Sequence, residues 1–340
     1  MARISIIILC KDESVRIGEC LRSLADQSLL RTGNVIEVLV VPNGCTDNTA
    51  AAAEASRSVF DSLSNVVFRV EELKQGGKSR SWNIAVHQLS DPGAEYLVFL
   101  DGDIELAHDQ VLEHLFETLV SHPSLEVVSG KPIKESARKS NQNILERLSL
   151  SASEVTGYIN VINGSCYVAK AAPLREVWLP NDLPGEDGFL NAVVTTEGFT
   201  TSHILENVRQ PAAPTHFYAP ETLSGFFHHE RRIIVGTIIN RWLIEHIRGM
   251  ALGRHAGSWI RQQNEQDPDW VDEIVAKRAD GRIWVIPTEV FFHRLIKRPD
   301  QTHWAWIRNL PLRLLVFAAT IPPVVGANRI LKQKAASKTW

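Results

Sequence analysis

Short apolar runs alternate with stretches of helical spacing through the first 130 residues of the chain. The apolar runs are rich in β-branched residues, and between them apolar residues recur every three or four positions, as at Ile17, Leu21 and Leu24. The predicted strands are Ile4–Cys10, Glu37–Val41, Val66–Val70, Tyr96–Leu100 and Val127–Gly130, and the predicted helices are Ser14–Gln27, Thr46–Arg57, Gly77–Leu89 and Asp109–Ser121. This alternation predicts an α/β fold with a mainly parallel sheet and helices on both faces.

Polar residues gather directly after each of the first four predicted strands. These clusters are Cys10–Glu13, Pro42–Asp47, Gln75–Lys78 and Asp101–Asp103. In an open parallel sheet, ligands bind outside the carboxyl ends of the strands, where the connecting loops meet. The four clusters therefore predict one binding site at that edge of the sheet.

Two carboxylates separated by one glycine follow the apolar run YLVFL, in the segment Asp101-Gly102-Asp103. Two negative charges this close repel each other unless a cation lies between them and other oxygen ligands. Mg²⁺ or Mn²⁺ bridging these carboxylates to a diphosphate would remove the repulsion and stabilise the charge on a leaving nucleoside diphosphate. The alternative is an acidic turn that caps the next helix, which accounts better for Asp109 than for Asp101.

Four sequence blocks contain these clusters, namely ISIIILCKDESVRIGECLRSL, EVLVVPNGCTDNT, GGKSRSWNIAV and YLVFLDGDIEL. In this order they resemble the first strand and helix, the second strand and turn, the Gly/Lys loop and the metal-binding loop of the family-two glycosyltransferases of the GT-A fold. The resemblance implies a GT-A domain over residues 1–220 that transfers a sugar, with inversion, from a nucleotide-diphosphate donor to an acceptor hydroxyl. Bacterial polysaccharide or glycolipid synthesis is the implied setting, with a glycan or glycolipid as acceptor.

The resemblance also implies a donor site, residue by residue. The nucleotide base and ribose would lie against Cys10, Asp12, Glu13 and Asn43, the diphosphate or sugar near Lys78 and Asn83, the ribose or sugar at Asp101 and Gly102, and the metal chiefly on Asp103 with Asp101. Where the family usually has an aspartate, this chain has Pro42-Asn43, so a UDP-sugar is the favoured donor but another base stays open. Asn43-Gly44 is also a natural turn sequence.

An acidic pair, Glu186-Asp187, lies in LPGEDGFLNAVV and resembles the family's ED motif at the start of a helix. An inverting transfer needs one carboxylate to accept the proton of the attacking hydroxyl, and Asp187 is the predicted base, with Glu186 beside it. Acidic residues in a first helical turn, favoured by the helix dipole, are the alternative. The segment NGSCYVAK at 163–170 resembles the strand that lines the acceptor side, with Asn163 and Gly164 in the wall.

Two further residues are weaker candidates. Arg232, in FFHHERRIIVG, occupies the Arg position of a QxxRW-like motif and could clamp the diphosphate, although the missing Gln and Trp argue against a processive enzyme. His216, in PTHFYAP, could ligate the metal, and a hydrogen-bonded histidine at a strand end is the alternative.

Residues 221–340 are predicted to form a helical segment that is basic and rich in tryptophan. Residues 231–340 hold 18 Lys and Arg against 9 Asp and Glu, together with seven of the nine tryptophans, whereas residues 1–230 hold 18 against 30. This pattern suggests peripheral contact with an anionic membrane, or a solvated basic face over an ordinary core. The apolar run Leu310–Val325 is short for a spanning helix and predicts an interfacial element or a last helix packed on the core. The residues that would anchor the interfacial element are Trp304, Trp306, Arg329, Lys332, Lys334 and Lys338.

Other sequence features restrict the class of protein and its expected location. Charged residues at Lys11, Asp12 and Glu13 end the N-terminal apolar run before it could serve as a signal-peptide core, and the four cysteines show no metal-site spacing. We expect a cytoplasmic protein, peripheral on the cytoplasmic face of the membrane, with no structural metal and no nucleic-acid partner. A polar helix is also predicted around residues 141–155.

Two rival functions remain open. A sugar nucleotidyltransferase would carry a glycine-rich loop after the first strand, which CKDESVRIG lacks. A non-catalytic nucleotide- or membrane-binding scaffold of the same fold is compatible with Asn43 and the incomplete QxxRW-like motif. The intact acidic pairs at 101–103 and 186–187 favour the enzyme.

Overall fold

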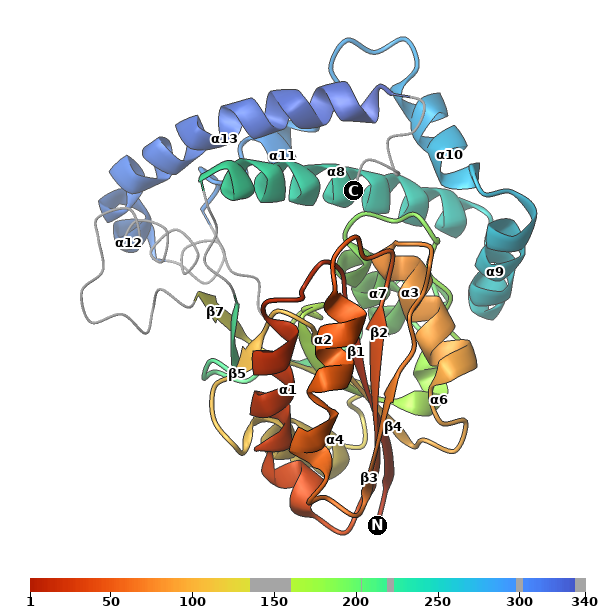
Figure 1. The fold of residues 1–340 in the computed structure, drawn as a ribbon. Coiled ribbons are helices and arrows are strands. Elements are labelled where there is room, and N and C mark those ends of the chain that lie inside the picture. Colours follow the sequence, from red (N-terminus) through yellow and green to blue (C-terminus); the bar gives the residue numbers. More distant parts are fainter. Residues whose placement is uncertain (135–159, 203, 219–222, 298–301, 334–340) are drawn as a thin grey trace.

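A computed structural model describes residues 1–134, 160–202, 204–218, 223–297 and 302–333 (Figure 1). A central sheet with its helices forms one part of the molecule, and helices from the C-terminal third form a layer above it in this view. The helix predicted around residues 141–155 and the flanking residues Lys334 and Lys338 lie outside the described residues.

The central sheet has seven strands in the order β3-β2-β1-β4-β8-β6-β9. The strands are β1 (Arg3–Cys10), β2 (Val35–Pro42), β3 (Val66–Val70), β4 (Tyr96–Asp101), β6 (Val127–Ser129), β8 (Cys166–Lys170) and β9 (Val208–Arg209). Strands β1 to β4 pair in parallel, and β8 runs antiparallel to both β4 and β6. The prediction of a mainly parallel sheet is confirmed.

Both faces of the sheet are buried, which explains why its strands read as continuous apolar runs. In β1, Ile7 and Leu9 enter one core while Ile6 and Ile8 enter the other. Helices α1 (Ile17–Ala25), α2 (Thr49–Ala55) and α4 (Val111–Ser121) supply residues to the second core, and α3 (Lys78–Ile84), α6 (Ala171–Leu174) and α7 (Glu186–Thr195) supply residues to the first. The predicted α/β architecture with helices on both faces follows from this alternation.

A second, three-stranded sheet lies beside the carboxyl end of β4. It consists of β5 (Glu105–Leu106), β10 (His216–Tyr218) and β7 (Pro132–Lys134), with β10 in the middle. His216 pairs with Leu106 in the β5–β10 ladder. This pairing brings residue 216 close to the loop at Asp101–Asp103, from which it is far apart in the sequence.

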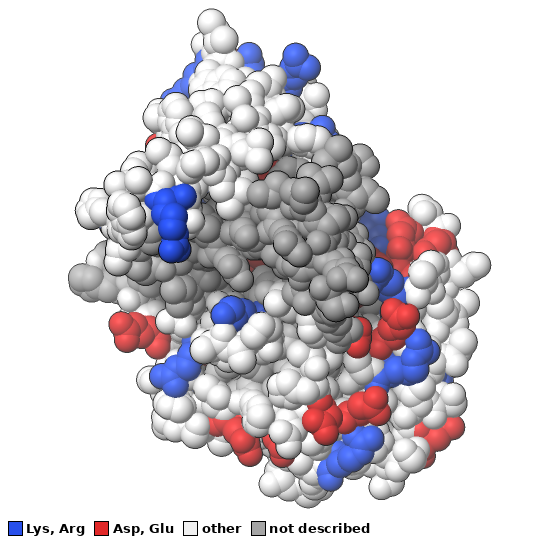
Figure 2. Space-filling model, turned by 90° about the vertical axis from the view of Figure 1, so that its left-hand side faces the viewer, with Lys and Arg blue, Asp and Glu red and all other residues white. Residues whose placement is uncertain are grey.

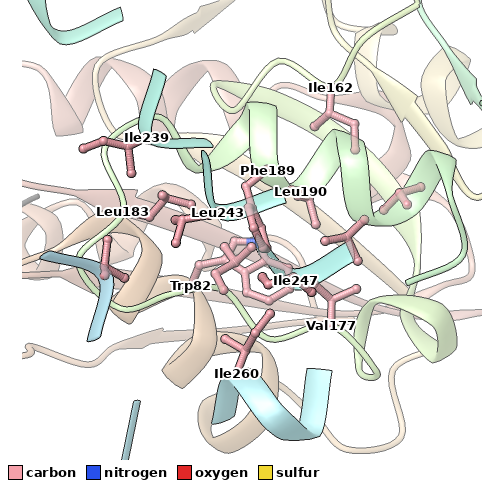
Figure 3. Packing of buried hydrophobic residues seen from close by; sticks show 14 of the residues in the cluster. Trp82, Ile162, Val177, Leu183, Phe189, Leu190, Ile239, Leu243, Ile247 and Ile260 are labelled. Carbon is pink, nitrogen blue, oxygen red and sulfur yellow. The ribbon is translucent and has the colours of Figure 1, made fainter. Parts of the chain in front are cut away.

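The C-terminal helices are not a separate unit, because they share the first core with the sheet. They are α8 (Leu223–Gly249), α9 (Ala256–Gln266), α10 (Trp270–Ala279), α11 (Thr288–Phe291), α12 (His303–Arg308) and α13 (Leu310–Leu331). Figure 3 shows Ile239, Leu243 and Ile247 of α8 packed around Trp82 of α3 and Phe189 of α7. The helical character predicted for residues 221–340 is confirmed, and its core is continuous with that of residues 1–220.

Candidate active site

Strand register brings three of the predicted loops together at the carboxyl edge of the sheet. Cys10 at the end of β1 lies opposite Pro42 of β2, and its neighbour Leu9 lies opposite Asp101 of β4. The Gly76–Gly77 loop joins them, since the amide N–H of Gly77 donates to Oδ1 of Asn43 at 3.3 Å. The predicted clustering of polar loops at one edge is therefore present in the structure.

Lys78 connects three distant parts of the chain at this edge. Its Nζ lies 2.6 Å from Oδ1 of Asp101 and 3.1 Å from Oε1 of Glu186, and it donates to the carbonyl oxygen of Gly164 at 3.3 Å. Burial acts to lower the pKa of Lys78, but the two carboxylates outweigh burial and raise the pKa above its ordinary value. The ammonium group therefore stays charged and holds the Asp101 loop against the start of α7.

The acidic pair lies at the first turn of α7, after a sharp backbone change. Gly185 has a φ of 77°, a left-handed conformation that glycine adopts without steric cost. Glu186 is buried and bound to Lys78, whereas Asp187 is half-buried and its Oδ1 accepts the Gly188 N–H at 2.8 Å. Burial, and then the charge of Glu186, raise the pKa of Asp187, and a raised pKa makes a carboxylate a stronger base.

A small pocket lies between these charged groups and the core. Its polar wall is formed by Lys78, Asp101, Gly164, Glu186 and Asp187, and its apolar wall by Leu9, Trp82, Phe99, Leu100, Tyr167 and Leu190. The apolar wall is rigid because the Trp82 indole N–H donates to the Tyr167 hydroxyl at 2.7 Å and the Phe99 ring stacks on both side chains. A Cβ atom at Gly164 would lie 2.8 Å from Oε1 of Glu186, so a larger residue there would displace the Glu186 carboxylate.

Carboxylates gather on the other side of Asp101. Burial, and then the Asp103 carboxylate, raise the pKa of Glu13 to about 7. Burial raises the pKa of Asp101 to about 6, with Lys78 opposing and Asp103 adding to the shift. Carboxylate oxygens are the ligands that Mg²⁺ and Mn²⁺ prefer, so the donor types of Glu13, Asp101 and Asp103 suit a divalent cation. Among the described residues, the ligand atoms that lie within 4.8 Å of one another belong to Asp12, Cys45 and Asp47.

Gly102 is required by packing within this loop. A Cβ atom at Gly102 would lie 2.5 Å from Cβ of Cys10, far closer than two carbon atoms can approach. Cys10 itself is buried, and burial raises the pKa of its thiol well above the ordinary value. The donor-binding prediction for Cys10 therefore concerns its backbone, whose carbonyl oxygen already accepts the amide of Asn43 at 2.8 Å.

The predicted base-binding residues have structural partners in the loops. Asn43 is 3% exposed and uses both its amide nitrogen and its oxygen within the protein. Asp12 is exposed, has a φ of 56°, and its Oδ1 accepts the Thr46 N–H at 2.6 Å. Asp12 is accessible to a ligand, whereas contact with the Asn43 side chain would have to replace one of these hydrogen bonds.

Three predicted residues lie away from the pocket walls. Asn83 is buried, and its amide bonds the backbone N–H and carbonyl of Leu179, so it anchors the segment before α7. His216 is fully buried, with Nε2 2.7 Å from the Ser165 hydroxyl and Nδ1 2.9 Å from the Thr215 hydroxyl, and burial lowers its pKa to about 3. Metal ligation by His216 would require one of these hydrogen bonds to break. The third residue, Arg232, is exposed on α8.

Residues of α8 that the sequence did not suggest also shape the site. A Cβ atom at Gly236 would lie 2.4 Å from the Pro184 carbonyl oxygen, and Asn240 donates from Nδ2 to the Gly185 carbonyl at 2.7 Å. These contacts position the turn that precedes Glu186 and Asp187. The only local signal was a glycine inside an otherwise apolar helical run, which marks close packing without naming the partner.

Comparisons with known proteins agree with this arrangement. Residues 5–169 match the model of the family described as Glycosyl transferase family 2. Glycosyltransferase AglE of Haloferax volcanii is 33% identical over 127 residues, which are 37% of this chain and 38% of AglE, so the match spans well under half of that relative. The mannosyltransferase PcManGT from Pyrobaculum calidifontis, solved in complex with GDP-Man and Mn²⁺, has a TM-score of 0.54 at 17% identity and covers 95% of this chain and 87% of its own.

The fold is thus that of the GT-A class, with a mixed, mostly parallel sheet and a C-terminal helical region. Over residues 5–169 the chain matches glycosyl transferase family 2.

Proposed function

We propose that this chain is a metal-dependent, inverting glycosyltransferase that moves a sugar from a nucleotide-diphosphate donor to an acceptor hydroxyl. The observation that supports this most is the position of Lys78, whose ammonium group links Asp101 of the donor loop to Glu186 of the acidic pair. Donor-binding and proton-accepting groups are thereby held around one pocket.

The donor side of the site is assigned to the loops after β1, β2 and β4. Asp103 would hold the divalent cation together with the donor phosphates, with Glu13 and Asp101 close by. When bound, the cation would supply the positive charge that stabilises a leaving nucleoside diphosphate. Asp101 is held by Lys78 at 2.6 Å, so its carboxylate is oriented to accept hydrogen bonds from a ribose or sugar hydroxyl.

The chemical step is assigned to Asp187. Its carboxylate accepts the proton of the acceptor hydroxyl as that oxygen forms a bond to the anomeric carbon. The bond from the anomeric carbon to the diphosphate oxygen breaks on the opposite face, and its electron pair leaves with the nucleoside diphosphate. Glu186 stays bound to Lys78 and positions the turn, and no covalent enzyme intermediate is needed.

The donor and the acceptor of this transfer are proposed as follows. A UDP-sugar is the first donor to test because of the family resemblance of the loops, and GDP-mannose is the second because PcManGT binds GDP-Man on the same fold. The acceptor is a glycan or glycolipid in polysaccharide or glycolipid synthesis. The proposal includes peripheral contact of residues 221–340 with an anionic membrane on its cytoplasmic face.

A donor panel tests the proposal directly. UDP-, GDP- and dTDP-sugars would be incubated with the full chain and Mn²⁺ or Mg²⁺, with or without EDTA, and released nucleoside diphosphate measured. We expect one donor to be consumed only with metal, and Asp187→Asn to lower turnover by about 10² or more while nucleotide affinity stays within about twofold. The exposed Asp61→Asn variant is the matched control.

Two outcomes would overturn the assignment. Nucleotide binding without turnover of any donor would favour the non-catalytic scaffold. Full activity of Asp187→Asn would remove the proposed base while leaving the family assignment intact. An NMR measurement of the anomeric configuration in the product tests inversion separately.

A further inference from the structure

Helix α13 presents an apolar face to solvent along most of its length. Leu314 is 50% exposed, Leu315 57%, Ile321 41% and Val325 37%. These positions, with exposed Ala318 and Pro322 between them, recur every three or four residues and therefore lie on one side of the helix. Single exposed apolar residues are ordinary on protein surfaces, but a continuous row of this kind marks an interaction surface.

The opposite side of α13 is tied into the fold. It packs along α8 (Figure 1), with Val324, Ala327 and Leu331 in the common core. Asn328 is buried, accepts the Val285 N–H at 2.8 Å and donates to the Ile283 carbonyl at 3.2 Å. These contacts hold α13 along α8, with one side of the helix buried and the other side exposed to solvent.

By length and composition alone α13 could cross a membrane, since it has 22 residues and a mean hydropathy of 1.7. A spanning orientation would carry Arg313 and Asn328, both buried in the fold, into hydrocarbon, where charged and amide groups are costly. It would also break the contact with α8 and open the core that surrounds Trp82. The structure therefore favours a helix that lies in the interface over one that crosses it.

Neighbouring elements extend the same outer surface. In α12, Trp304 is 74% and Ile307 51% exposed. Phe292 and Ile296 after α11 are also exposed, and the Phe292 ring stacks on Phe317 of α13 at 5.6 Å. The loop before α11 carries Ile283, 88% exposed, beside the C-terminal end of α13. Exposed Trp and aliphatic side chains on adjacent elements are typical of proteins that enter the lipid headgroup region.

Exposed basic residues lie at both ends of α13, while the exposed acidic residues Asp280 and Glu289 lie on the segments before it. The sequence from residue 301 onward contains no Asp or Glu, while Arg308, Arg329 and Lys332 are exposed at the two ends of α13. In Figure 2 the upper part of the face, which α12 and α13 occupy in Figure 1, shows Lys and Arg among uncharged residues, whereas red Asp and Glu gather lower on the molecule. A second copy of the chain would bring two basic rims together, but an anionic bilayer neutralises the rim.

We infer that the outer face of α13, with Trp304, Ile307 and Ile283, docks on an anionic phospholipid surface with the helix axis in the membrane plane. The row of leucines would enter the acyl boundary and the basic residues would contact lipid phosphates. Helix α8 then lies between the membrane and the pocket, with its inner side on the turn before Glu186. This inference rests on the peripheral membrane contact in the proposed function, for which it names the residues. It does not depend on the catalytic assignment.

Vesicle flotation tests the docking surface with the full chain. The vesicles would be phosphatidylcholine alone, or phosphatidylcholine with about one third phosphatidylglycerol, a composition that gives a strongly negative surface. We expect the protein to float with the anionic vesicles and much less with the neutral ones. Leu314→Ser with Leu315→Ser should lower the bound fraction on anionic vesicles by about tenfold.

Matched variants separate lipid binding from other effects. Arg329→Gln with Lys332→Gln should weaken binding to anionic vesicles and leave the low binding to neutral ones unchanged, while Val67→Ser, an exposed apolar position on β3, should change neither. Equal flotation of the wild type and the leucine variant would overturn the inference. So would a concentration-dependent dimer, seen by sedimentation, that the leucine variant alone loses, because a second copy would then cover the face. Donor turnover in lipid-free buffer, expected to be unchanged by these variants, reports on the proposed enzyme independently.

Discussion

The side-chain amide of Asn240, in the middle of α8, donates a hydrogen bond of 2.7 Å to the carbonyl oxygen of Gly185. Gly185 is the left-handed residue directly before Glu186 and Asp187. The orientation of the proposed catalytic base is therefore set in part by a helix that follows it by about fifty residues, in a segment that the sequence pattern assigned to membrane contact.

Asn240→Leu should lower kcat without unfolding the protein. The substitution keeps the branched shape of the side chain but removes the donor to Gly185, so the turn and Asp187 lose a restraint. We expect a fall of about tenfold in kcat, with donor affinity within about twofold, because the donor loops are not touched. Steady-state kinetics with calorimetric nucleotide binding checks this, and Thr237→Ala, exposed on the same helix, is the control. An unchanged kcat would contradict the positioning role.

Lys78→Met should be costly to both stability and activity. It leaves the Asp101 and Glu186 carboxylates facing each other without the ammonium group between them. Because the Lys78 side chain is 34% exposed, solvent screens part of this repulsion, and a loss of about 1–3 kcal/mol in the free energy of unfolding is expected. Urea denaturation measures it, with the exposed Lys74→Met as control. Wild-type stability and turnover in Lys78→Met would rule out the link between the two loops.

The metal-free protein should lose stability as the pH rises from about 4.5 to about 7, through Glu13. Its pKa is raised from 4.5 to about 7 in the folded state, so over this range the folded state holds a proton that the unfolded state has released. Thermal denaturation should therefore show Glu13→Gln gaining stability over the wild type at pH 8 but not at pH 4. Mn²⁺ should stabilise the wild type more at pH 8 than at pH 5. The exposed Glu19→Gln should show neither effect, and a Glu13→Gln variant that behaves like it would refute the raised pKa.

Asp103→Asn should uncouple nucleotide binding from the metal. In the wild type we expect Mn²⁺ to strengthen UDP or GDP binding by at least about tenfold, or ~1.4 kcal/mol. The variant should lose most of that gain while keeping the metal-free affinity. Calorimetric titrations with and without Mn²⁺ measure both numbers, and Asp109→Asn, exposed at the start of the next helix, controls for simple loss of acidic charge. Equal metal dependence in Asp103→Asn would move the cation site elsewhere.

The parts of the structure that the sequence predicted are those decided by local spacing. The β1 run of Ile4 to Cys10 is buried on both faces, and the α1 residues Ile17, Leu21 and Leu24 are buried on one, so their periods are visible in the sequence. The placement of Lys78 beside Asp101 was implied by the loops after β3 and β4. These inferences needed no knowledge of contacts between distant segments.

What escaped prediction depends on distant contacts. Asn83 looked like a donor ligand by position, but its amide is used by Leu179, 96 residues away. Likewise, nothing in the sequence around Asn240 indicates that its side-chain amide reaches Gly185. His216 could be read either as a ligand or as a hydrogen-bonded strand residue, and only the fold places the hydroxyls of Ser165 and Thr215 on its two nitrogens.

The core that Trp82 shares with α8 also determines whether the C-terminal helices could be exchanged between related proteins. A segment that only attached the enzyme to its surroundings could be exchanged between relatives like an adaptor. Here Ile239, Leu243 and Ile247 form part of the interior behind the pocket, so a chain that ends near residue 220 would expose that interior and leave the turn at Gly185 without its contacts from α8. The helical layer is therefore part of the folding unit that carries the pocket, and it could not be exchanged as a separate module.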